Sequence, residues 1–300
     1  LAEFREKLKK DKRLPFITEL VKSEKPDYSY LKAAASKLVP SEPEKSDKCH
    51  IEKAFSQTTE ILFVTQFEHI DDYPEWLSNA SSIRLDHEKS CASERALLLP
   101  DFAGFIDFPR DRLLMQDEAY FFGEHLTLDK SEAESLSLEN AGRLLSKIAY
   151  FCPFWLAGKL QNNINCPLVI DASECYHGIQ NMWSRLCAFC FCPRNSEYCF
   201  GCREVRYAQF SMNSHFSTKI TRCFEVDHSN NCTDCFFCHN CENVHESMFC
   251  FNTRNKRYAI GNVEFGKEKY MEMKKLLLEW IIKSLEKEKK LRASIFNLKS

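Results

Sequence analysis

The sequence predicts an α+β protein in which N-terminal helices and a mixed α/β segment precede a cysteine-rich, right-handed β-helix-like stack capped by a long C-terminal helix. Three observations support this fold class. Twelve of the 16 cysteines lie between Cys175 and Cys250. In the same region small and apolar residues recur at regular intervals, as expected for stacked short turns. Residues 267–300 carry apolar residues at the three- and four-residue spacing of an amphipathic helix.

Composition narrows the class of protein. The chain has 300 residues and a net charge of -2, and this balance argues against a dedicated binder of duplex DNA. Glycine occurs only 8 times, and no glycine-rich nucleotide loop is present. The apolar stretch 148–158 is too short to span a membrane, and the charged start of the chain does not resemble a secretion signal. We therefore expect a cytoplasmic protein without a membrane segment.

Residues 1–48 are expected to form a helical N-terminal segment that ends in a polar, proline-containing linker. Residues 49–170 are expected to form a mixed α/β segment. Its predicted elements are a buried strand over 61–67, strand or turn over 95–108, a helix over 131–151 and a short buried strand over 166–171. Ser131 and Glu134 are expected to form the capping box of that helix.

Residues 171–262 form the predicted stack. A step of five from Cys190 reaches Asn195, Phe200, Val205, Phe210, His215 and Ile220. A step of six from Ile220 reaches Val226, Cys232, Cys238, Val244 and Cys250, and the parallel row Cys223, Ser229, Cys235, Cys241, Ser247 and Thr253 is small throughout. Such rows are expected where one turn of a β-helix lies on the next, with buried cysteine acting as a small hydrophobe. The change from five to six predicts an irregular repeat.

Residues 263–300 are expected to supply the cap. The apolar face of this helix comprises Tyr270, Met273, Leu277, Ile281 and Leu285. A solenoid has to cover its last open turn, and the helix is expected to seal it. The helices at both ends of the chain are also predicted to dock a protein partner or a second copy of the chain.

Two cysteine sets have metal-ligand spacing. Cys187, Cys190, Cys199 and Cys202 form C-x2-C-x8-C-x2-C, and two such pairs are typical of tetrathiolate zinc sites. Cys232, Cys235, Cys238 and Cys241 form C-x2-C-x2-C-x2-C, which approaches the run that binds an iron–sulfur cluster. The last gap is one residue short, and no proline follows. The alternative for both sets is that the cysteines are buried structural thiols.

Thiol catalysis is a further alternative. Cys175 lies near His177 in sequence, and Cys223 lies near His228. A catalytic dyad depends on geometry rather than sequence distance, and neither pair lies within a known signature. We therefore assign no catalytic residue. Because several cysteines are only three residues apart, we expect free or metal-bound thiols in a reducing compartment rather than disulfides.

The end of the stack resembles a group of uncharacterised cysteine-rich repeat proteins of uncultivated bacteria and archaea, which end in an RNKxYxIxN motif. The matching residues are Arg254-Asn255-Lys256-Arg257-Tyr258, Ile260 and Asn262, followed by Lys267-Glu268-Lys269-Tyr270. The resemblance covers roughly the last third of the chain. It implies a β-helical stack closed by a C-terminal helix, and it implies no activity. That group often carries CxxC pairs before the stack, and this chain has none before Cys187.

These observations favour a non-enzymatic structural or interaction protein with a thiol-rich β-helical core. One alternative is a zinc-binding protein that contacts nucleic acid or a protein complex. Its nucleic-acid face would combine aromatic residues with Arg203, Arg206, Lys219, Arg222, Arg254, Lys256 and Arg257. Another alternative is an iron–sulfur redox protein or maturation factor. Nucleic acid is the less favoured partner.

Overall fold

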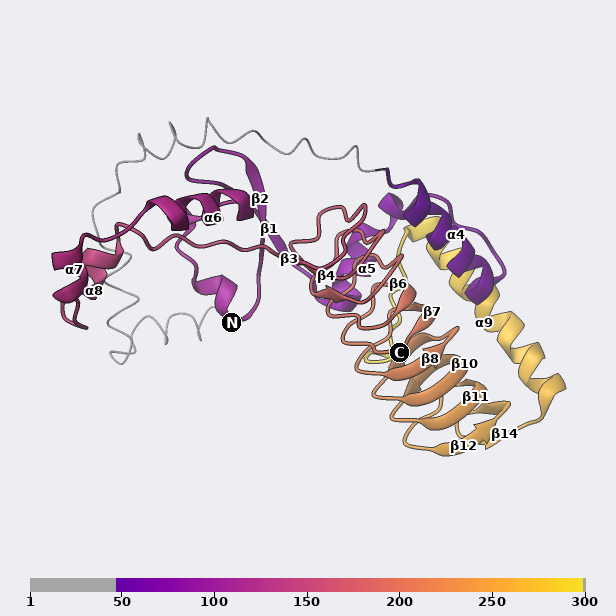
Figure 1. Ribbon diagram of the computed structural model, residues 1–300. Coiled ribbons are helices and arrows are strands. Elements are labelled where there is room, and N and C mark those ends of the chain that lie inside the picture. Colours follow the sequence, from indigo (N-terminus) through magenta and orange to yellow (C-terminus); the bar gives the residue numbers. More distant parts are fainter. Residues whose placement is uncertain (1–46, 299–300) are drawn as a thin grey trace. The chain divides into compact units, whose positions relative to one another are not determined.

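The computed structural model describes residues 47–298, so the helices expected before residue 47 lie outside the described residues. The described chain divides into two compact units (Figure 1). Residues 86–154 belong to the first unit. Residues 47–85 and 155–298 form the second unit, which contains the stack.

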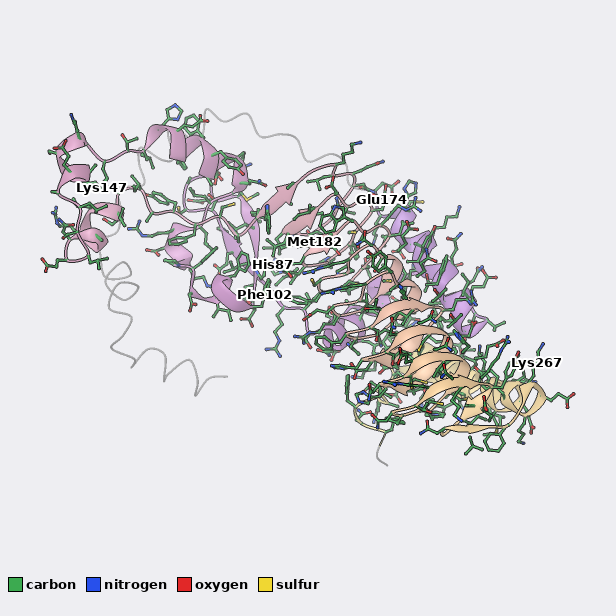
Figure 2. All side chains as sticks on the ribbon, turned by 60° about the horizontal axis from the view of Figure 1, so that its bottom comes forward. His87, Phe102, Lys147, Glu174, Met182 and Lys267 are labelled. Carbon is green, nitrogen blue, oxygen red and sulfur yellow. The ribbon has the colours of Figure 1, made fainter. Side chains whose placement is uncertain are left out.

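The first unit is a small mixed α/β unit (Figure 2). Its two-stranded sheet pairs β1 (Leu85–Lys89) with β2 (Ala96–Pro100). The strand or turn predicted over 95–108 is therefore confirmed. The remaining elements are η2 (Ala103–Asp107), η3 (Arg110–Arg112), α6 (Gln116–His125), α7 (Lys130–Glu134) and α8 (Ala141–Leu145).

The single helix predicted over 131–151 is wrong, because the chain forms the two short helices α7 and α8. Polar side chains between them bond to the local backbone: Asn140 accepts from the amide of Ser137 at 2.8 Å and donates to the carbonyl of Ser135 at 2.9 Å. Such bonds compete with helical ones. The capping box is formed by Asp129 and Glu132, two residues earlier than predicted.

The strand predicted over 61–67 is also wrong. Residues 61–63 complete the helix α4 (Cys49–Phe63), whose buried residues Ile51, Phe55 and Leu62 recur at helical spacing. The helix ends at Val64, which adopts a left-handed conformation with a φ of 61°. The short helices η1 (Ile70–Asp72) and α5 (Pro74–Ser81) follow.

The stack is a β-solenoid of parallel strands and bridges, which confirms the predicted β-helix-like fold. It begins at Trp155, whereas the sequence placed its start at residue 171. The short buried strand predicted over 166–171 is present but belongs to the stack. The strands are β3 (Trp155–Ala157), β4 (Leu168–Ile170), β5 (Asn181–Met182), β6 (Glu197–Phe200), β7 (Gln209–Met212), β8 (Thr218–Thr221), β9 (Phe224–Asp227), β10 (Asn230–His239), β11 (Glu242–Met248), β12 (Arg254–Arg257), β13 (Ala259–Ile260) and β14 (Val263–Glu264).

From β4 onward each coil of the solenoid contains 12 residues, because parallel partners lie 12 positions apart. The first pair, β3 with β4, is 13 positions apart. The coil is built from triplets, of which Asn231-Cys232-Thr233 is one. Asn231 turns the corner with a φ of 53°. Cys232 is buried in the interior, and Thr233 pairs with Thr221 and His245 of the adjacent coils. Positive φ recurs every third residue, so four triplets make a four-sided coil.

This geometry corrects the predicted repeat. The step of five is wrong, because Cys190 points inward, Asn195 lies at a corner and Phe200 points outward. The step of six is twice the true spacing of three. Both rows that it selected therefore lie at inward positions, and the repeat is regular.

Stacked side chains stabilise the corners. A left-handed conformation costs an ordinary residue roughly 1–2 kcal/mol, and asparagine tolerates it better than most residues. Asn231 donates to Asn243 at 3.2 Å, and Asn243 donates to Asn255 at 2.7 Å, so the amides form a ladder up one corner. Aromatic rings stack at other corners, as Tyr198 does on Phe210 with ring centroids 4.5 Å apart.

One side of the solenoid is covered by helices. The outward residues of this helix-covered side are large and apolar: Phe200, Met212, Phe224, Phe236 and Met248. Phe55 of α4 contacts Phe200 edge-on at 5.3 Å, and Phe63 contacts Phe224 at 5.0 Å. Burial of these aromatic side chains is expected to dominate the attachment of the helices.

The predicted C-terminal helix is confirmed as α9 (Lys267–Glu288), but its position differs from the expected one. It runs beside α4 along the helix-covered side (Figure 1). Tyr270 donates to the carbonyl of Asp234 at 3.3 Å, and Lys274 lies 4.8 Å above the ring of Phe236. The end of the stack is instead turned back by the antiparallel pairing of β13 with β14.

Candidate functional site

Thiols fill much of the interior of the solenoid, where 12 cysteines cluster, whereas Cys192 lies at a corner with a φ of 55°. All 16 cysteines are free, and the 13 from Cys166 to Cys250 are buried. A typical thiol donates to the carbonyl two residues before it and approaches the carbonyl nine residues after it. For Cys235 these acceptors are Thr233 at 3.4 Å and Val244 at 3.2 Å. Interior serines bond in the same way: the hydroxyl of Ser217 donates to His215 at 2.7 Å and approaches Val226 at 3.4 Å.

The first predicted metal set lies in two adjacent coils. Cys187 and Cys199 occupy one interior column, and Cys190 and Cys202 occupy the next. Zinc bound by four thiolates needs sulfur atoms about 3.8 Å apart, as follows from a zinc–sulfur distance of about 2.3 Å. Among the described residues, however, no three cysteine sulfurs lie within 4.8 Å of one another. In the structure these four side chains pack in the buried interior.

The second predicted set forms one complete ring. Cys232, Cys235, Cys238 and Cys241 occupy the four inward positions of consecutive triplets, one on each side of the coil. The C-x2-C-x2-C-x2-C spacing is therefore the triplet spacing of the solenoid. An iron–sulfur cluster is therefore not needed to explain the spacing. As for the first set, no three of the sulfur atoms lie within 4.8 Å of one another.

Burial keeps several of these thiols protonated, whereas hydrogen bonds between thiols favour the ionised form of others. Burial raises the pKa of the Cys166 thiol to about 12 and raises the pKa of Cys190 and Cys199 well above the usual value. Hydrogen bonds from neighbouring thiols instead lower the pKa of Cys202, Cys232 and Cys250, the last of which lies near the end of the stack. A hydrogen bond from Cys238, with help from the positive charge of Lys256, lowers the pKa of Cys250 to about 7.

Neither thiol–imidazole pair predicted from the sequence forms a dyad. Cys175 points into the core and bonds to the carbonyl of Ser173 at 3.5 Å. His177 lies at a corner and stacks on Phe189 with ring centroids 5.4 Å apart. Cys223 likewise bonds to carbonyls inside the solenoid.

The basic residues proposed for a nucleic-acid face are dispersed rather than gathered. Their positions in the 12-residue coil place Arg203 and Arg206 on different sides. Arg222 pairs with Asp234 at 2.6 Å. Arg254 and Arg257 pair with Glu242 and Glu246. The ion pairs reduce the positive charge available to a phosphate backbone.

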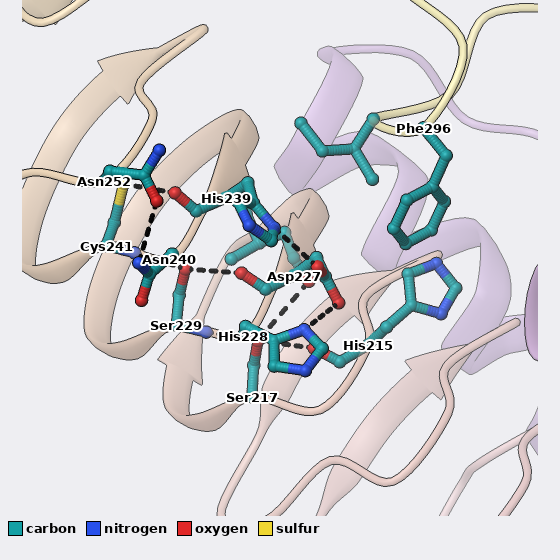
Figure 3. Close-up of polar contacts among 12 residues, drawn as sticks. His215, Ser217, Asp227, His228, Ser229, His239, Asn240, Cys241, Asn252 and Phe296 are labelled. Atoms are coloured by element: carbon teal, nitrogen blue, oxygen red, sulfur yellow. Dashed lines mark hydrogen bonds and ion pairs between the residues drawn. The ribbon is translucent and has the colours of Figure 1, made fainter.

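A different group of polar residues gathers on an outward side of the coil. We call Asp227, His228 and His239 the Asp227 cluster (Figure 3). Asp227 is only 1% exposed, at the end of β9. One carboxylate oxygen lies 2.8 Å from Nδ1 of His228, and the other lies 2.7 Å from Nδ1 of His239. Among the described residues this is the only group of three candidate metal ligands whose ligand atoms lie within 4.8 Å of one another.

The backbone explains this convergence. His239 stands directly opposite Asp227 in the pairing of β10 with β9, one coil further along. His228 follows Asp227 at a corner with a φ of 47°, which turns its imidazole back toward the carboxylate. The two side chains are 37% and 58% exposed, so the cluster is open to solvent.

A cavity of about 330 Å³ lies beside the cluster. Its polar lining includes the buried carboxyl of Glu225 and the side chain of His215. The backbone of His215 forms a parallel β-bridge with that of Asp227. Burial raises the pKa of Glu225 to about 8. That carboxyl accepts from the amide of Ile295 at 2.8 Å. Phe296 lies 5.3 Å from the His215 ring, so the C-terminal segment forms one wall.

The sequence reasoning missed this cluster. It considered His228 only as a sequence neighbour of Cys223 and did not consider Asp227. The 12-residue separation of Asp227 and His239 is the signal that identifies their pairing. It becomes informative only when the coil length is known.

Comparison with known proteins does not identify the chain. No protein-family model matches it, and a search of curated proteins finds no match either. Within residues 47–298, the helices are all too short or too polar to cross a membrane. The fold itself defines the class of protein, which is a β-solenoid with a cysteine-filled core.

Proposed function

We propose that the protein is a non-enzymatic structural and interaction protein, in which the solenoid is a stable support and its thiols are core side chains. The observation that carries this proposal is the bonding of the interior thiols. They occupy the same positions as the interior serines and donate to backbone carbonyls in the same way. The resemblance to cysteine-rich repeat proteins agrees with this role. Free thiols also favour a reducing compartment such as the cytoplasm.

Thiol labelling tests this role. In the native protein we expect Cys49, which is exposed, to react rapidly with an alkylating reagent. Cys91 and Cys152 should react slowly, because burial raises the pKa of both thiols, that of Cys91 to about 12. The 13 buried thiols should react only after the chain unfolds. Mass spectrometry of timed samples would identify the labelled residues.

Cys250 provides an internal control. It lies near the end of the stack and its pKa is lowered to about 7, so as denaturant is added it should react before interior thiols whose pKa burial raises, such as Cys166 and Cys190. Anaerobic purification with metal and sulfide analysis completes the test. A brown protein containing iron and sulfide, or buried thiols that react in the native state, would contradict a purely structural role.

For the interaction role we propose a second copy of this chain as the partner of α9. The buried face of this helix contacts the solenoid, whereas Leu276 and Trp280 are 54% and 47% exposed on another face. Glu272 precedes Leu276 by four residues, and Lys283 follows Trp280 by three, so all four side chains lie along one stripe. We call these four residues the α9 stripe.

The order of charges along the α9 stripe supports self-association. In an antiparallel two-fold pairing, the acidic end of one stripe meets the basic end of the other, with the apolar residues between them. Two-fold dimers with the same patch on both subunits are the commonest homo-oligomers. The stripe therefore has a charge pattern that fits such a dimer, in which Glu272 would exchange its 2.8 Å ion pair with Lys269 for Lys283 of the second copy.

Trp280→Glu is expected to convert the dimer to a monomer, because it places a negative charge in the apolar centre of the interface. Sedimentation velocity over a range of protein concentrations would measure the change. Leu138→Glu is the matched control, since Leu138 is 89% exposed and lies in the other unit. Wild-type protein that stays monomeric at high concentration would refute the proposed partner while leaving the structural role intact.

A further inference from the structure

We propose that the Asp227 cluster binds a divalent transition-metal ion of the zinc type. Two imidazoles and one carboxylate are a donor set that proteins use for zinc and for other first-row metals. Here the donors come from two adjacent coils, and the pairing of β9 with β10 fixes their spacing. The site is separate from both cysteine sets considered above.

Both oxygens of the buried Asp227 carboxylate face an imidazole nitrogen, so three potential ligand groups converge at one point. As hydrogen bonds to a carboxylate, both contacts need a proton on Nδ1 of the imidazole. A cation placed between the three groups would replace these protons, which is how metal binding to protonatable ligands proceeds.

The distances suit a metal without backbone movement. Zinc lies about 2.0–2.2 Å from nitrogen and oxygen ligands, so three such ligands stand roughly 3.4 Å apart in a tetrahedron. The Nδ1–carboxylate distances of 2.7 and 2.8 Å need only small side-chain rotations to reach that spacing. The carboxylate is held by its burial, while the more exposed imidazoles can adjust.

Aromatic rings flank both imidazoles of the proposed site. The ring of Phe216 lies 5.0 Å from that of His228, and the ring of Phe251 lies 6.2 Å from that of His239. The exposed edges of the two imidazoles leave the remaining coordination positions to water.

Cobalt and zinc titrations of the chelator-treated full chain would test the site. We expect one Co²⁺ per chain, with visible absorption bands typical of nitrogen and oxygen ligands, and we expect Zn²⁺ to displace it. Asp227→Asn and His228→Gln should each weaken Zn²⁺ binding at least about tenfold in calorimetry. Zn²⁺ should raise the unfolding temperature of the wild type but not that of the variants.

Two controls keep the test decisive. His228→Gln removes a side chain that is 58% exposed, so it should leave the metal-free fold intact even if Asp227→Asn does not. His245→Gln removes another exposed stack imidazole, which contacts Asn243 instead, and should not change the affinity. Failure of the wild type to bind either ion, unchanged affinity in His228→Gln, or a sulfur-to-cobalt charge-transfer band would overturn the proposal.

Discussion

Replacing Cys235 by phenylalanine is expected to lower the free energy of unfolding by about 3 kcal/mol, because the ring of four inward side chains leaves no room for an aromatic group. Cys235 is fully buried, with Cys223 and Ser247 above and below it in the same column. Neighbouring coils are only about 4.8 Å apart, so the added atoms cannot be relieved along the axis. Urea denaturation followed by circular dichroism would measure the loss.

The matched control is Cys235→Ser. Ser247, the next residue of the column, already donates to the carbonyl two positions earlier, at 2.7 Å from His245. A serine at 235 can make the equivalent bond to Thr233, and the change should cost less than about 1 kcal/mol. A severe loss in Cys235→Ser, with loss of bound iron, would instead identify this residue as a cluster ligand.

Replacing Asn243 by valine is the second substitution with a large expected effect, about 3 kcal/mol. Asn243 is exposed, so the change removes no buried apolar contact. It does force a β-branched residue into a corner where φ is 54°, a conformation that such residues strongly disfavour. It also removes the amide bonds to Asn231 and Asn255. Thermal and urea unfolding would both report the effect.

Asn243→Gly separates the two causes. Glycine adopts the corner conformation without steric strain, so this variant should lose only the ladder bonds, at a cost of about 1 kcal/mol. If glycine were as harmful as valine, the ladder rather than the backbone would govern corner stability. If valine were harmless, the corners would not be constrained as the φ values indicate.

Much of the fold follows from the sequence, but the coil length does not. The inward row that passes through Ile220, Cys232 and Val244 was recognisable because the interior accepts only small or apolar side chains. The corners were not recognisable in the sequence. Residues that seldom adopt left-handed conformations, such as Phe237 and Glu246, do so there with φ of 51° and 46°. Stacking on the next coil compensates for the local strain, and a single sequence does not display that compensation.

The predictions that failed elsewhere in the chain did so for similar reasons. The apolar run 61–67 has the composition of a strand, yet the preceding helix extends into it because its buried face continues to Leu62. Packing against the solenoid, rather than local composition, therefore determined the structure of residues 61–63. For the Asp227 cluster, the residue types were visible, but their proximity depends on a pairing across 12 positions. Without the coil length, Asp227 and His239 have no evident relation.

Because α9 lies along the stack, the length of this helix and the number of coils are expected to be related. At about 1.5 Å per residue, the 22 residues of α9 extend for roughly 33 Å, which matches about seven coils. A chain that gained one coil by duplication of 12 residues would keep every pairing but would need about three more helical residues. An insertion that is not a multiple of 12 residues would move the side chains that follow it to different sides of the coil. Changes in size are therefore expected to proceed in whole coils, with the helix lengthened or shortened to match.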